Sequence, residues 1–165
     1  LEQDQAYELF NQYHNKVPFV KELSRQVSNV AGSRGYIKTL LGRKRRFDLW
    51  EPRDSWGEKA YSLSEAYAHY PKQELKRAYT HTALNALIQG SSADITKAAM
   101  IKIYEAGILD EIDLKLTIHD ELDFSIPQNK QKCFEEALQI MKTCVKLKVP
   151  LKVDVEKGDN WGNAK

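Results

Sequence analysis

The stretch LKLTIHDELDFSI, residues 114–126, places the strictest constraint on how this chain can fold. Its apolar residues recur at every second position: Leu114, Leu116, Ile118, Leu122, Phe124 and Ile126. This spacing puts them on one face of a strand, but it also puts Asp120 in the middle of that face, where an unpaired carboxylate is costly to bury. A chain reversal at His119, Asp120 and Glu121 removes the cost, because the arms then pair as a hairpin with the acids at its tip.

Two interpretations of this tip remain open. The first is an ordinary acidic turn, because Asp side chains bond nearby backbone N–H groups in turns. The second is a metal site, because Asp120 and Glu121 are adjacent carboxylates and Mg²⁺ prefers oxygen ligands. The two cysteines, Cys133 and Cys144, show no zinc-site spacing with the histidines.

The other periodicities predict one α+β domain with mainly antiparallel pairing. Helices are expected over residues 2–15 and from Pro18 to about Ala31, followed by a basic hairpin over 35–47. Residues 48–76 are interpreted as an irregular insertion with a short helix near 63–69. A helix is then expected from about 74 to 106, another within 128–147, and a strand over 150–158.

Composition excludes some classes of protein. No apolar run approaches the roughly 20 residues that span a bilayer, and the polar N-terminus carries no secretory signal. Two cysteines suit a reducing compartment, so we expect a cytoplasmic protein without a membrane partner. The net charge of +2 says little about partners, but the run RKRR concentrates cations at Arg43, Lys44, Arg45 and Arg46. This run is either a solvated loop or a phosphate-binding segment.

A second group of polar residues is spaced by four: His81, Asn85 and Gln89. This spacing places them along one ridge of a helix. The ridge is either a solvated face or a set of hydrogen-bonding groups that contact the acceptors of the DNA minor groove. Gly90 follows the ridge, and a mid-helix glycine indicates close approach by another group.

Four segments resemble family A DNA polymerases, and they occur in that family's order. ALNALIQGSSADITKAAM (83–100) is similar to the pattern N-x-x-x-Q-G-x-x-A-D-x-x-K-x-A-M, and IHDELDFSIP (118–127) resembles motif C. GYIKTLLGRKRRF (35–47) resembles the G-Y-x-x-T-x-x-G-R-R segment, and VPLKVDVEKGDNW (149–161) resembles the C-terminal strand with its closing G-x-x-W. Residues 48–76 have no clear counterpart. His81 stands where cellular members of the family usually carry Arg, and in this respect the chain resembles the phage replicative branch.

The resemblance implies a role for each matching residue. Asp120 matches the aspartate that helps bind two catalytic Mg²⁺ ions, and Glu121 matches its lesser neighbour. His119 matches a residue at the primer end. Asn85 and Gln89 match residues that contact primer–template DNA, and His81 shares their ridge. The implied chemistry is nucleotidyl transfer from deoxynucleoside triphosphates, in a palm that forms part of a right-hand fold.

The sequence lacks a motif A segment with the second aspartate, and it lacks the fingers helix. We therefore expect a C-terminal polymerase segment, with helices over 1–34 and palm over 77–165, that is inactive without the N-terminal remainder. An exposed sheet edge in such a piece would favour self-association. The alternative is a non-catalytic DNA-binding module or an inactive remnant of a polymerase. A stand-alone metal nuclease is disfavoured, because two adjacent carboxylates are few ligands for two metals.

Overall fold

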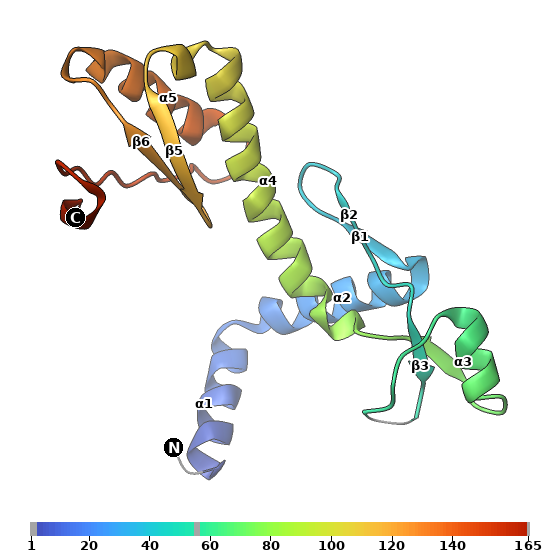
Figure 1. Cartoon of the computed structure of the whole chain (residues 1–165). Coiled ribbons are helices and arrows are strands. Elements are labelled where there is room, and N and C mark those ends of the chain that lie inside the picture. The colour runs from blue at the N-terminus through green and yellow to red at the C-terminus, as the bar shows by residue number, and fades with distance from the viewer. Residues whose placement is uncertain (1–2, 55–56, 165) are drawn as a thin grey trace. The chain divides into compact units, whose positions relative to one another are not determined.

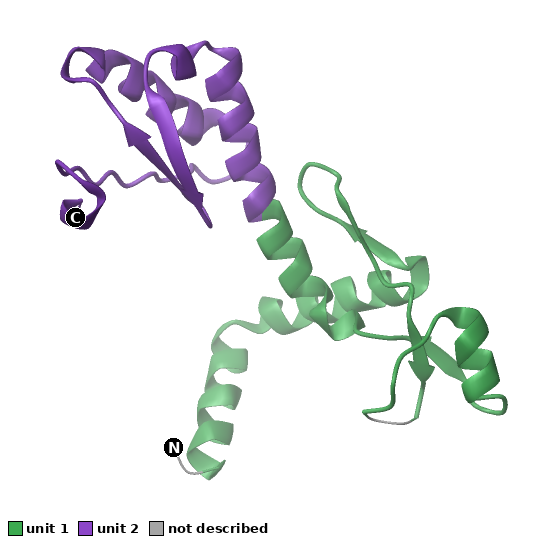
Figure 2. Cartoon of the chain, in the orientation of Figure 1, with its two compact units in different colours: residues 1–91 green, residues 92–165 purple. Residues whose placement is uncertain are grey.

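The computed structural model describes residues 3–54 and 57–164, which form two compact units, residues 1–91 and 92–165 (Figure 2). Both units combine helices with antiparallel strand pairs, in agreement with the predicted α+β class. None of the helices within the described ranges is both long and apolar enough to cross a membrane.

The first unit begins with helices α1 (Gln3–Lys16) and α2 (Pro18–Arg34), close to the predicted bounds (Figure 1). Pro18 starts α2, where its missing N–H is not required. Gly35 ends α2 in the left-handed conformation at φ 77°, and its N–H donates to the carbonyl of Ala31. The sequence rules for helix ends therefore hold at both termini of α2.

The predicted basic hairpin is present as β1 (Tyr36–Lys38) and β2 (Lys44–Arg46). Antiparallel pairing places Tyr36 opposite Arg46, Ile37 opposite Arg45 and Lys38 opposite Lys44. The hairpin packs on a core cluster of Val27, Ala31, Ile37, Phe47 and Ala83. Opposed residues share a face, so Arg45 lies on the same face as buried Ile37, while Lys44 and Arg46 lie on the other face.

The segment predicted to be an irregular insertion has regular structure. Strands β3 (Trp50–Pro52) and β4 (Leu75–Arg77) pair with each other, and helix α3 (Leu63–His69) lies between them in sequence, as predicted. The prediction of a helix from about residue 74 is wrong, because residues 75–77 pair as β4 and Tyr79 then takes a positive φ of 59°. A 3₁₀ turn, η1 (Thr80–Thr82), leads into α4 (Ala83–Glu105).

The second unit contains the predicted hairpin, formed by β5 (Asp113–Ile118) and β6 (Glu121–Ser125). After a register shift between Leu114 and Leu116, Leu116 lies opposite Asp123 and Ile118 lies opposite Glu121. The prediction that these two residues share a face with Leu122 and Phe124 is therefore wrong, and Leu116 is 50% exposed. The bulge explains this, because one extra residue reverses the order of faces along a strand.

Helix α5 (Gln131–Thr143) contributes Phe134 and Ala137 to a second core cluster, which also contains Ile103, Ile108 and Ile112. Short 3₁₀ turns lie at Ile108–Asp110, Gln128–Lys130 and Trp161–Asn163. Residues 150–158 do not form the predicted strand, because no strand within the described residues offers them backbone partners. Leu151 and Val153 are half-buried, and Val155 is exposed.

Candidate functional site

The β5–β6 hairpin turns through His119 and Asp120 alone. Ile118 pairs with Glu121, so Glu121 begins β6 instead of lying in the turn as expected. His119 takes a positive φ of 53°, and Asp120 does not. Two-residue hairpin turns require a positive φ at the first loop position, where Gly is the usual residue. A histidine there is strained, and such strain is concentrated at functional positions.

The side chains of this tip are all exposed and are presented by a short, hydrogen-bonded pair of strands. Asp120 and Glu121 supply hard carboxylate oxygens, which fit Mg²⁺ better than a soft metal. Within the described ranges, however, no group of three or more His, Cys, Asp or Glu side chains is arranged to hold a metal ion. Asp120 and Glu121 are thus two candidate oxygen ligands for Mg²⁺, which usually keeps several waters and binds one or two carboxylates.

The polar ridge lies in the first unit. Asn85 and Gln89 share one face of α4, while His81 lies in the preceding turn η1, and all three side chains are exposed. The ridge is thus available to a partner along its length.

Gly90 is explained by the protein itself, since the hairpin loop lies against it. A Cβ at Gly90 would lie 2.7 Å from Cγ2 of Thr39, and the Gly90 carbonyl accepts a 2.8 Å hydrogen bond from Arg43 Nη2. Leu40 N–H also donates to Ser91 Oγ at 3.0 Å. Close approach was correctly predicted, but the approaching group is the β1–β2 loop.

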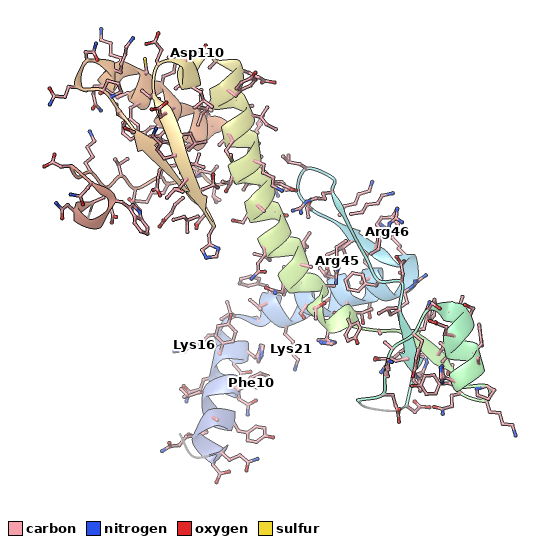
Figure 3. All side chains as sticks on the ribbon, viewed as in Figure 1. Phe10, Lys16, Lys21, Arg45, Arg46 and Asp110 are labelled. Carbon is pink, nitrogen blue, oxygen red and sulfur yellow. The ribbon has the colours of Figure 1, made fainter. Side chains whose placement is uncertain are left out.

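The four cations of RKRR have different surroundings. Arg43 is anchored to α4 through Gly90. Arg45 lies 5.7 Å from the centre of the Phe47 ring, and Lys44 lies 4.9 Å from that of Tyr36. Arg46 lines a pocket with Lys44 (Figure 3 labels Arg45 and Arg46). A run that is continuous in sequence is therefore divided between two faces of the hairpin.

Two cations that the sequence analysis did not single out lie beside Lys44 and Arg46. Arg34 ends α2, and Arg77 ends β4, and both line the same pocket. Arg77 Nη1 donates to the carbonyl of Phe47 at 2.8 Å, and its guanidinium lies 4.5 Å from the Trp50 ring. Their sequence separation from RKRR explains why no local pattern revealed them.

The family model and the relatives that match this chain are all DNA polymerases. Residues 1–163 match the family model of DNA polymerase family A. A DNA-directed DNA polymerase of Pseudomonas phage M6 is 40% identical over 156 residues, which are 94% of this chain and 19% of that protein. DNA polymerase theta of Drosophila melanogaster is 31% identical over 173 residues, covering 99% of this chain and 8% of the relative.

Among solved structures, the polymerase domain of Pol1 from M. smegmatis, in complex with DNA primer-template and dNTP, matches with a TM-score of 0.76 and 31% identity. The match covers 99% of this chain and 26% of that one. The chain thus spans about a fifth of the phage relative and a quarter of the Pol1 domain. On this evidence, the chain belongs to DNA polymerase family A.

Proposed function

We propose that this chain is the portion of a template-directed DNA polymerase that carries the motif C aspartate, Asp120. The observation that supports this most directly is the hairpin tip, where a strained His119 precedes an exposed Asp120 in a two-residue turn. An ordinary acidic turn would gain stability from Gly at the first position. The histidine in its place is consistent with a functional role at the primer end.

In this proposal Asp120 binds catalytic Mg²⁺, and Glu121 contributes from the adjacent strand position. Magnesium, when bound, stabilises negative charge on the reacting phosphate and activates the attacking hydroxyl. The pairing of Ile118 with Glu121 fixes the backbone on both sides of the turn, so that little backbone ordering is needed when the reaction begins. The described residues contain no group of three or more possible metal ligands, so in this proposal a second aspartate comes from the N-terminal part of the polymerase.

The exposed ridge of Asn85 and Gln89 would contact primer–template DNA, with His81 at its start. Amide side chains both donate and accept hydrogen bonds, so they suit the acceptor atoms that every base pair presents in the minor groove. Such contacts bind DNA with little preference for sequence, as a replicative polymerase requires.

The β5–β6 sheet and the unpaired segment 150–158 are where the N-terminal part would add backbone partners. Without it, a second copy of the chain would compete for the open strand edge. Light scattering would then detect dimers that disappear when the N-terminal part is added.

The test is a templated primer-extension assay on the chain mixed with a fragment that carries motif A and the fingers. We expect Mg²⁺-dependent extension from the mixture and none from either part. Asp120→Asn should reduce extension at least about a hundredfold, since metal binding supplies several kcal/mol of transition-state stabilisation.

The matched control is Asp113→Asn, which makes the same substitution at an exposed residue of β5. The Oδ2 atom of Asp113 forms a 2.9 Å ion pair with Nζ of Lys115. This variant should extend normally. Extension by the isolated chain, or full activity of Asp120→Asn, would refute the proposal. DNA binding without extension in the mixture would favour a non-catalytic module.

A further inference from the structure

The first unit contains a basic pocket of about 270 Å³ between the end of α2, the β1–β2 hairpin and β4. We propose that this pocket binds a phosphate group of a nucleic-acid strand. Its cations are Arg34, Lys44, Arg46 and Arg77, and Asp48 is its one carboxylate. None of the residues that line the pocket belongs to the polar ridge or to the motif C tip, so phosphate binding in the pocket would not depend on either of them.

Strand register selects which cations of RKRR face the pocket. Lys44 and Arg46 are two residues apart on β2 and lie on the face of Tyr36, which also lines the pocket. Arg45 lies on the opposite face, over Phe47. Arg43 is hydrogen-bonded to the Gly90 carbonyl. The pocket therefore uses alternate members of the run.

Arg77 is held in place before any ligand binds. Its guanidinium is stacked over Trp50, and Nη1 donates to the Phe47 carbonyl. Gly35 permits this position, because a Cβ there would lie 2.7 Å from Cζ of Arg77. Nε is shielded from solvent and has no acceptor among the described residues. A guanidinium fixed in this way loses little conformational entropy on binding phosphate.

The charge of the pocket is unbalanced. In the part of the chain that the structure describes, none of these four cations is within ion-pairing distance of a carboxylate. Four like charges around one pocket repel one another, and Asp48 offsets only one of them. An anion that replaces this repulsion with charge-assisted hydrogen bonds is the ligand that the pocket favours.

The surroundings favour a phosphate within a strand over a free phosphate. Lys38 is opposite Lys44 on the same exposed face of the hairpin, so positive charge continues beyond the pocket. A continuous basic track suits a backbone with one phosphate per nucleotide. This choice of nucleic acid, unlike the preference for phosphate, rests on the proposed role in DNA synthesis.

The test measures binding of the 165-residue chain to a fluorescent single-stranded oligothymidylate by anisotropy, across a series of salt concentrations. Arg46→Ala removes one pocket cation. Arg45→Ala is the matched control, since it removes the same charge from the neighbouring position on the opposite face.

Each phosphate contact contributes about 0.7 to the slope of log K against log salt for a single strand. We expect Arg46→Ala to reduce the magnitude of this slope by about 0.7. With equal affinities at 1 M salt, this change in slope makes the variant bind about fivefold more weakly at 0.1 M, because 10 to the power 0.7 is about 5. Asp48→Asn should bind more tightly, and Arg45→Ala should change affinity by less than half as much as Arg46→Ala on the logarithmic scale.

Equal losses in the Arg45 and Arg46 variants would overturn the proposal, since they would mean diffuse charge attraction. A second arm titrates inorganic phosphate, and saturation by phosphate without any loss of DNA binding in Arg46→Ala would overturn the nucleic-acid assignment. These assays require no catalysis. Failure of primer extension therefore does not contradict phosphate binding by the pocket, and failure of phosphate binding does not contradict the proposed role in primer extension.

Discussion

Replacing Gly90 with Ala should destabilise the first unit, although helix propensity alone predicts the opposite. Alanine in a helix interior gains about 1 kcal/mol over glycine. At Gly90 the added Cβ would lie 2.7 Å from Cγ2 of Thr39, which is too close for any real contact. Thr39 is only 7% exposed and its hydroxyl donates to the Arg43 carbonyl, so its methyl group has little room to move.

Overpacking of this kind costs about 1–3 kcal/mol, which offsets or exceeds the gain in propensity. Gly32→Ala in α2 is the matched control, because nothing lies within 4 Å of its added Cβ. The propensity term is common to both variants, so the difference in unfolding free energy between them should be about 1–3 kcal/mol. Urea denaturation followed by circular dichroism measures this difference from the transition midpoints.

A second substitution identifies the cause. Thr39→Ser removes Cγ2 but keeps the hydroxyl, so in the Gly90→Ala background it should restore stability toward that of Gly32→Ala. The reasoning is refuted if Gly90→Ala is as stabilising as Gly32→Ala, or if Thr39→Ser brings no recovery.

Three further expectations follow from single contacts. His119→Gly relieves the positive φ and should leave stability unchanged or higher by up to about 1 kcal/mol in denaturation, while primer extension by the complemented enzyme falls. Gly35→Ala displaces the guanidinium of Arg77 and strains the end of α2, so oligothymidylate binding should weaken at unchanged net charge; unchanged affinity in the folded variant would contradict the geometry. The hydroxyl and then the backbone N–H of Ser62 hold the pKa of Glu65 below its ordinary value of 4.5. This stabilisation is present above pH 4.5 and is lost as the pH falls through the lowered value, and in Ser62→Ala an NMR titration should find the pKa of Glu65 raised.

The hairpin at Asp120 was predictable because two local rules agree there. Alternation of apolar residues specified strands, and the cost of burying a carboxylate specified a turn. The bulge that exposes Leu116 was not predictable, since a period-two pattern does not reveal an extra residue in one strand. Local rules thus located the tip but not the register of the strands beneath it.

The errors elsewhere arise from pairing between distant segments. Leu75–Arg77 form a strand because Trp50–Pro52 lie beside them, and neither segment is long enough to indicate this alone. Residues 150–158 show the reverse case, because they alternate like a strand and find no partner among the described residues. An alternating pattern indicates that a segment is compatible with a sheet. It does not show that a second segment is available to pair with it.

The basic run shows the same limit for function. The sequence predicts one basic cluster at RKRR, but the structure divides its charges between two faces of the hairpin. The hairpin turns Lys44 and Arg46 to one face and Arg45 to the other, and the first face then gains Arg34 and Arg77 from a helix end and a separate strand. Because each added cation raises the repulsion within the pocket, such a gathering is unfavourable unless an anion relieves it. The observation that points to a ligand is therefore the convergence of charges from three elements, and strand register determines which charges converge.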